Sequence, residues 1–208
     1  MSAELVAQAK EIDTWVGIQL DLIRVFGLRL KESIMVRPTI ADQGAVLRIE
    51  EGTKGGRTRN IPIATADQRA VLDAAKHSAS RNPKGRLCNP RLTVEQAKRR
   101  FFYVVGEKLG VTKAEPGVTV HGLRHEYAND LYERVSGSPS AVRGGSIVDR
   151  AADEKARHEV SQNLGHARLS ITASYSGRRT QGRPRGNAAE TTDAPGPNLK
   201  NDDGVDIG

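Results

Sequence analysis

The N-terminal part of the chain carries apolar residues at helical spacing. Over Ala3–Phe26 no proline intervenes, and the pattern predicts one or two helices whose apolar positions are Ile12, Trp15, Val16, Leu20 and Ile23. Gly27 interrupts this pattern, which resumes over Leu28–Met35 until Pro38 stops it. The first segment of the chain is therefore predicted to be helical.

Residues 45–63 change to a pattern typical of strands. Two β-suited runs, VLRIEEG and RNIPI, flank a Gly-Gly turn, which predicts an antiparallel β-hairpin with Lys54 at or near its tip. Helical spacing then returns. Thr65 with Gln68 and Thr93 with Gln96 have capping-box spacing and predict two further helices, with the basic stretch RNPKGRLCNPR as a loop between them.

The C-terminal half follows a break at Pro116 and Gly117. A helix is predicted over about Val120–Val135, and the small residues of Ser136–Ser146 predict a flexible loop. Asp153–Leu164 is again helical in pattern and ends at Gly165, while residues 169–175 are consistent with one more short helix. The fold class predicted is mainly α with a small antiparallel β-hairpin (α+β).

Composition limits the chain to one core. Only 37% of the 208 residues are apolar, and after Tyr175 the chain turns to Gly, Pro, Asn, Thr and Asp with almost no apolar residues. Residues 1–176 are therefore expected to form one domain and residues 177–208 a disordered tail. The tail has five basic and five acidic side chains, so the net charge of +7 belongs to the part before it.

Charge and cysteine content limit which binding partners and which cellular compartment are expected. An excess of 32 Lys and Arg over 25 Asp and Glu indicates a polyanionic partner, nucleic acid before membrane, although a solubilising surplus remains the alternative. The single Cys88 excludes an intramolecular disulfide. No apolar run approaches the roughly 20 residues of a spanning helix, and no signal peptide is visible. We expect a cytoplasmic, nucleoid-associated protein.

The stretch VTVHGLRHEYANDLYE carries the densest candidate chemistry. It places His121, Arg124 and His125 within five positions. If the stretch is helical, His121 and Arg124 share one face and can converge on one anionic group. The alternative is a solvated amphipathic helix with a core of Leu123, Tyr127, Ala128 and Leu131.

Three other motifs join this one in a fixed order. Gly27-Leu28-Arg29 precedes Glu32, Lys54 lies in TKGGRTR, and Leu164-Gly165-His166 is followed nine residues later by Tyr175. With His121-Gly122-Leu123-Arg124-His125, these motifs resemble the catalytic domain of the tyrosine recombinases, the phage-type integrases. The resemblance covers residues 15–175.

The resemblance implies a tyrosine recombinase catalytic-domain fold and a role for each motif residue. Arg29 and Arg124 would clamp the attacked phosphate, and Tyr175 would be the nucleophile that forms a 3′-phosphotyrosine link. His121 would act as base or proton relay, and Lys54 would protonate the departing 5′ oxygen. His166 would donate a hydrogen bond to the phosphate. Supporting roles fall to Glu32, which would orient basic groups, and His125, which would support the helix.

Cofactors and partners follow from the same resemblance. No metal or nucleotide cofactor is needed, and the sequence has neither a GxxxxGK[ST] phosphate loop nor an acidic magnesium cluster. Double-stranded DNA is the expected partner, with self-association on it. Six further basic residues could follow DNA phosphates: Lys84, Arg86, Arg91, Lys98, Arg99 and Arg100. The alternatives are an inactive DNA-binding remnant or regulator, and a metal-dependent phosphoesterase using His121, His125 and His166.

The chain departs from the family pattern in three ways. Only 28 residues precede Arg29, where family members carry an N-terminal DNA-clamping domain, so a catalytic domain alone with weak DNA affinity is expected. Residues 136–153 look like an insertion. The tail lacks an apolar helix of the kind exchanged between protomers, which puts assembly through it in doubt.

Overall fold

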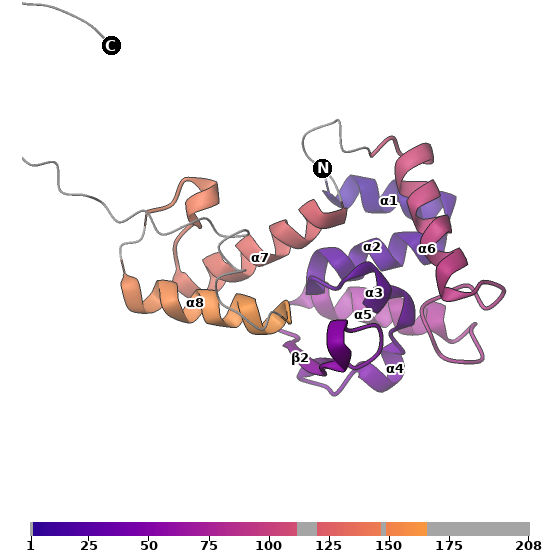
Figure 1. Cartoon of the computed structure of the whole chain (residues 1–208), viewed down its shortest axis with the longest axis horizontal. Helices are drawn as coiled ribbons and strands as arrows, with labels where there is room; N and C mark the ends of the chain where they lie inside the picture. Colours follow the sequence, from indigo (N-terminus) through magenta and orange to yellow (C-terminus); the bar gives the residue numbers. More distant parts are fainter. Residues whose placement is uncertain (1, 112–119, 147–148, 166–208) are drawn as a thin grey trace, which may run out of the picture.

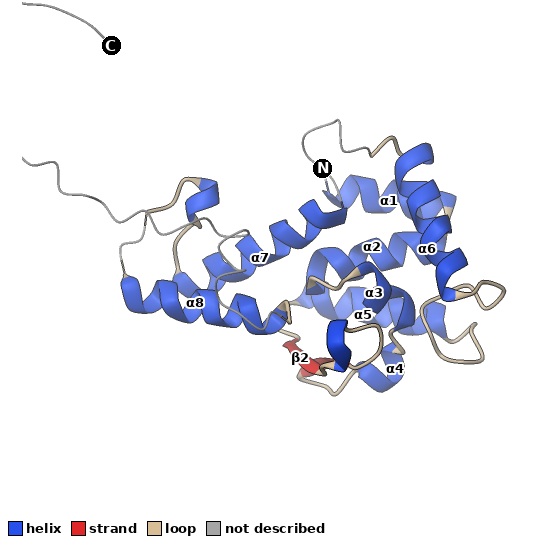
Figure 2. Cartoon of the chain, in the orientation of Figure 1, coloured by secondary structure: helices blue, strands red, loops and turns tan. Residues whose placement is uncertain are grey.

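A computed structural model of the chain describes residues 2–111, 120–146 and 149–165 (Figure 1). In chain order the elements are α1 (Ser2–Ile12), α2 (Thr14–Phe26), α3 (Leu30–Met35), α4 (Pro38–Ala41), β1 (Val46–Ile49), a 3-10 turn (Lys54–Gly56), β2 (Arg59–Pro62), α5 (Ala66–Ala79), α6 (Val94–Phe102) with a π-helical continuation (Tyr103–Lys108), α7 (Val120–Ser136), a second 3-10 turn (Ala141–Arg143) and α8 (Arg150–Asn163). Helices dominate, and the two strands form a small antiparallel sheet (Figure 2). The predicted α+β class is confirmed.

Local signals explain most of the boundaries. Asp13 separates α1 from α2 because its carboxylate accepts from the backbone N–H groups of Trp15 and Val16, at 3.1 and 3.3 Å. Gly27 ends α2 in the left-handed conformation, with φ of 61°. Both predicted capping boxes are present, and they begin α5 and α6. Pro38 does more than stop a helix, since it is the first residue of α4.

The core is built around α2. Ten of its thirteen residues are buried, and it packs against α1, α3, α5 and α7. The hairpin contributes Leu47, Ile49 and Ile61 to the same cluster, which extends to Val160 and Leu164 of the α8 segment. Since these apolar contacts surround α2 on several sides, they fix the ends of α2, α8 and the hairpin relative to one another.

The segment after α7 differs from its prediction. Residues 136–146 were expected to be a flexible loop, but Ser140 is fully buried and its hydroxyl donates to Asn129 Oδ1 at 2.6 Å. Arg143 in the 3-10 turn pairs with Asp130 and Glu133 of α7. The segment is therefore anchored to α7.

The last helix also begins earlier than predicted. α8 starts at Arg150, because Asp149 accepts from the N–H groups of Ala151 and Ala152. The first turn of α8 thus lies inside the segment expected to be an insertion. The helix suggested for residues 169–175 and the disordered tail lie outside the described residues. No helix within the described ranges is long and apolar enough to cross a membrane.

Candidate active site

Arg29 and Glu32 form the first part of the site, at the start of α3. Glu32 is fully buried, and its Oε2 accepts from the Arg29 backbone N–H at 2.7 Å. Its Oε1 accepts from Arg29 Nη1 at 2.8 Å. The helix start therefore fixes the guanidinium that the sequence predicted for phosphate binding.

Arg59, the first residue of β2, holds Glu32 from the other side. Its Nη1 and Nη2 donate to Glu32 Oε1 and Oε2 at 2.6 and 2.7 Å, a bidentate pair buried in the protein. Its Nε donates to the carbonyl of Asn163 at 2.9 Å. Sequence reasoning did not assign Arg59 to the site, although it lies close to Lys54 in the hairpin.

Two opposing influences set the charge state of Glu32. Burial acts to raise its pKa, but the hydrogen bonds and charges of Arg59 and Arg29 outweigh burial and leave the pKa below its ordinary value. Glu32 is therefore an ionised carboxylate shared by two guanidiniums.

Arg124 brings the second predicted guanidinium to the same place. It is 5% exposed and donates through Nη1 to the carbonyl of Gly27 at 2.9 Å. Its Nη2 donates to the carbonyl of Leu164 at 2.6 Å, and Arg29 Nη2 donates to that same oxygen at 3.2 Å. Two of the predicted site residues thus converge on one acceptor, at the end of α8 where the helix dipole is negative.

Gly165 closes the site at the end of α8. Its φ is 64°, and a Cβ there would lie 3.2 Å from Arg59 Cδ and 3.6 Å from Arg29 Nη1. The predicted role of Gly165 in ending the helix is confirmed. It also leaves room for the guanidiniums of Arg29 and Arg59.

A cavity of about 310 Å³ opens beside these arginines. It lies between the start of α3, the hairpin and the end of α8, and is lined by Arg29, Thr53, Arg57, Thr58, Arg59, Asn60, Gln162 and Gly165. Lys54 begins the 3-10 turn between the strands, as predicted for a residue near the hairpin tip. Its side chain lies outside the described part of the structure.

His121 and His125 lie one turn apart on α7. Their ring centroids are 4.5 Å apart with the planes nearly perpendicular, at 85°. His121 is exposed and His125 is half-buried. Burial, with the neighbouring His121 and Arg124, lowers the pKa of His125. His125 therefore favours its neutral form.

His166 and Tyr175 lie outside the described residues. Three other tyrosines can be placed. Tyr127 and Tyr132 are buried, and burial raises the pKa of each to about 12, with a hydrogen bond to Asp153 adding to the effect at Tyr132. Tyr103 is 43% exposed on the π-helical continuation of α6. Neither buried tyrosine is suited to attack a DNA phosphate.

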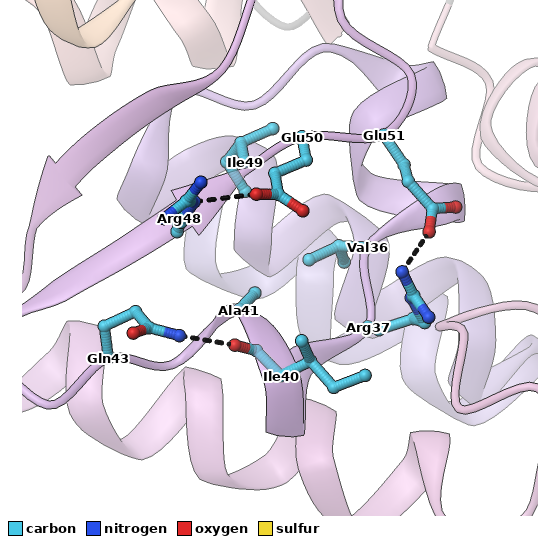
Figure 3. A pocket seen from close by; sticks show the side chains of 9 residues that line it. All are labelled: Val36, Arg37, Ile40, Ala41, Gln43, Arg48, Ile49, Glu50 and Glu51. Atoms are coloured by element: carbon cyan, nitrogen blue, oxygen red, sulfur yellow. Dashed lines mark hydrogen bonds and ion pairs between the residues drawn. The ribbon is translucent and has the colours of Figure 1, made fainter.

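A second pocket, of about 250 Å³, lies beside β1 and is lined by the nine residues labelled in Figure 3. Its charged groups pair with one another: Arg48 with Glu50 and Arg37 with Glu51, both at 2.7 Å. It contains none of the predicted site residues. In the described ranges, no three His, Cys, Asp or Glu side chains are grouped so as to hold a metal ion.

Comparison with known proteins identifies the family of the chain. A family model described as "Integrase" matches residues 1–130, which is more than half of the chain. Among solved structures, the XerA recombinase is similar with a TM-score of 0.53 and 20% identity, over 84% of this chain and 57% of that one.

The XerH site-specific recombinase, solved in a post-cleavage complex with its palindromic difH substrate, is similar with a TM-score of 0.51 and 20% identity. The match covers 84% of this chain and 46% of that one, so this chain spans about half the length of the two recombinases. No curated protein is significantly similar in sequence. The chain belongs to the Integrase family, and its fold is that of the tyrosine recombinase catalytic domains.

Proposed function

We propose that the chain is the catalytic domain of a site-specific DNA recombinase. The observation that carries this proposal is the convergence of Arg29 and Arg124 on the carbonyl of Leu164, at 3.2 and 2.6 Å. A carbonyl oxygen at a helix C-terminus carries partial negative charge. Two guanidiniums aimed at one such oxygen are suited to bind the non-bridging oxygens of a phosphodiester.

The reaction proposed is a transesterification. The Tyr175 hydroxyl attacks the phosphorus and gives its proton to His121, so that a tyrosine–phosphorus bond forms. The bond from phosphorus to the 5′ oxygen breaks, and Lys54 gives that oxygen a proton. The 3′-phosphotyrosine keeps the energy of the broken bond, and the reverse reaction joins a new 5′ hydroxyl. Arg29, Arg124 and His166 stabilise the charge that gathers on the phosphate.

The assignment of Tyr175 draws on the chain's own tyrosines. Tyr127 and Tyr132 are buried with raised pKa values, which leaves Tyr103 and Tyr175 as candidates. Tyr175 follows the end of α8, where the arginines meet, and it follows His166 at the family spacing. His125 is assigned a supporting role because its neutral ring packs against that of His121.

Double-stranded DNA is the proposed partner. XerH, a fold relative, was solved bound to its palindromic DNA substrate. A palindromic site presents two equivalent halves, so we further propose that copies of this chain associate on DNA. Residues 1–176 are proposed as the catalytic domain and residues 177–208 as a tail outside it.

A covalent-capture experiment tests the proposal. The chain is incubated with nicked duplexes of randomised sequence, in which the piece beyond the cleaved bond is short enough to diffuse away. We expect a denaturant-resistant protein–DNA adduct, whose DNA can be sequenced to identify the target. Tyr175→Phe should abolish the adduct, whereas the matched control Tyr103→Phe should retain it.

Two results would contradict the proposal in different ways. An adduct that persists in Tyr175→Phe would remove Tyr175 as nucleophile. Salt-dependent DNA binding without an adduct on any duplex would instead identify an inactive DNA-binding protein of the same fold.

A further inference from the structure

The buried ion pair between Arg59 and Glu32 lies directly behind the predicted phosphate clamp. We infer that Arg59 is a positioning residue that keeps the positive charge of Arg29 available to the substrate phosphate by neutralising Glu32. This inference rests on the proposed function. It assigns a functional role to a residue whose own nitrogen atoms donate inward, to Glu32 and to the carbonyl of Asn163.

Arg29, Glu32 and Arg59 form a cluster of charged side chains. Glu32 is fully buried and ionised, and each of its oxygens accepts one bond from Arg59 and one from Arg29. One carboxylate thus faces two guanidiniums, which leaves the group with one net positive charge. Without Arg59 the carboxylate would cancel the charge of Arg29, and the clamp would present less positive charge to a phosphate.

The two terminal nitrogens of Arg29 are held differently. Arg29 Nη1 is held by Glu32 at 2.8 Å, whereas Nη2 reaches the carbonyls of Leu164 and Gly165 at 3.2 and 3.4 Å. The longer bonds are the ones that a charged phosphate oxygen can replace. If Glu32 lost Arg59, its second oxygen would attract the guanidinium of Arg29 further inward and away from the phosphate.

The position of Arg59 in the chain adds a third observation. Arg59 begins β2, directly after the connection that carries Lys54, and its Nε holds the last turn of α8 through Asn163. It therefore links three segments of the site: the start of α3, the hairpin and the end of α8. A substitution at Arg59 therefore affects both the position of Arg29 and the hairpin that carries Lys54.

Adduct formation by substituted chains tests the inference. We expect Arg59→Met to slow adduct formation by about 10- to 100-fold, a loss of the size found when the hydrogen-bonded partner that orients a metal ligand is removed. Adding Glu32→Gln to Arg59→Met should restore a large part of the rate, because the uncompensated carboxylate is removed as well. Arg59→Lys, which keeps the charge but not the fork, should be slowed less than Arg59→Met.

A second readout uses the substrate. A methylphosphonate at the cleaved position lacks one negative charge, so it depends less on the charge of Arg29. The ratio of rates between the unsubstituted chain and Arg59→Met should therefore be smaller on this substrate than on the normal phosphate. A loss of structure alone would slow both substrates equally.

The matched control is Arg69→Met. Arg69 also pairs with a largely buried carboxylate, that of Asp42 at 2.6 Å, and neither residue lines the cavity beside Arg29 and Arg59. Its adduct rate should stay close to that of the unsubstituted chain, and thermal unfolding of each variant reports on folding. If Arg59→Met fails to fold, Arg59→Lys and the double variant carry the comparison on the two substrates.

The adduct rates of these variants distinguish a positioning role of Arg59 from a merely structural one. The inference is overturned if the double variant is no faster than Arg59→Met, or if the methylphosphonate leaves the rate ratios unchanged, while the unsubstituted chain forms the adduct. If the unsubstituted chain itself forms no adduct, the proposed function fails and the inference fails with it. Rescue by Glu32→Gln together with a smaller ratio on the neutral substrate supports the inference.

Discussion

Gly27 lies at one of the closest approaches in the molecule. Its φ is 61°, and its carbonyl accepts a hydrogen bond from Arg124. A Cβ added there would clash with Tyr127 Cδ1, and it would lie 2.8 Å from Cε1 of the same ring and 3.0 Å from Leu164 Cδ2. The residue therefore combines a left-handed backbone with a contact between α2, α7 and the end of α8. Because Gly27 precedes Arg29 by two positions, its backbone also sets where the first guanidinium begins.

Replacing Gly27 by alanine should destabilise the fold. The positive φ costs about 1–2 kcal/mol for a residue with a Cβ, and overpacking against Tyr127 costs about 1–3 kcal/mol more. The free energy of unfolding, measured with urea, checks the sum. Gly144→Ala is the control, because Gly144 has φ of 81° with nothing within 4 Å of its added Cβ. Equal losses in the two variants would show that the packing contributes nothing.

Part of the candidate site could be predicted from the sequence at the scale of single residues. Glu32 was expected to orient basic groups, and in the structure it binds the guanidinium of Arg29, three positions before it, at 2.8 Å. Arg59 could not be found in this way, because its partner Glu32 is 27 positions away and no local spacing encodes that pairing. The roles of Lys54, His166 and Tyr175 stay predictions that adduct formation can test.

At the scale of elements, helix starts with a side-chain cap were the most predictable. Thr65 and Thr93 each begin a helix as their capping boxes indicated. Residues 136–146 were expected to be flexible, because small residues and glycine are typical of loops, but the structure anchors this segment to α7. Ser140 instead uses its small size to bury a hydroxyl against Asn129, a tertiary contact that composition does not encode.

Ser140→Ala should therefore loosen this connection. Removing the hydroxyl leaves Asn129 Oδ1 without its donor in a buried position, which costs about 1–3 kcal/mol. We expect a lower unfolding temperature and faster proteolysis within residues 141–146. The exposed Ser146 provides the control, since Ser146→Ala should change neither. Unchanged proteolysis in Ser140→Ala would mean that other contacts hold the segment.

Across the whole molecule, basic residues differ in how they are paired. Of the six that were predicted to follow DNA phosphates, three form ion pairs: Arg86 with Glu51, Lys98 with Glu95, and Arg100 with Asp13. The other three, Lys84, Arg91 and Arg99, are exposed and form no ion pair with a carboxylate among the residues the structure describes. Sequence alone predicted the surplus of charge, but the pairing depends on contacts between distant segments.

This difference predicts two classes of DNA-binding variant. Changing Lys84, Arg91 and Arg99 together to glutamine should weaken DNA binding more than changing Arg86, Lys98 and Arg100, although both triple variants lose the same charge. Unpaired cations can each displace a counterion, so the first variant should reduce the slope of log K against log salt by up to about 3. Fluorescence anisotropy measured from about 50 to 200 mM salt, where the affinity for DNA changes strongly, gives both slopes. Equal slopes would contradict the prediction.

The three arginines of the site, Arg29, Arg59 and Arg124, all donate hydrogen bonds to backbone carbonyls at the end of α8. Arg29 reaches Leu164 across 135 positions of the chain, Arg59 reaches Asn163 across 104, and Arg124 reaches Leu164 across 40. A ribosome makes the chain from its N-terminus, so these bonds can form only after the end of α8 has emerged. The nascent chain can bury its first helices and hairpin early, yet the assembled cluster is among the last features to form. Synthesis order thus delays the completed cluster until nearly the whole described domain exists.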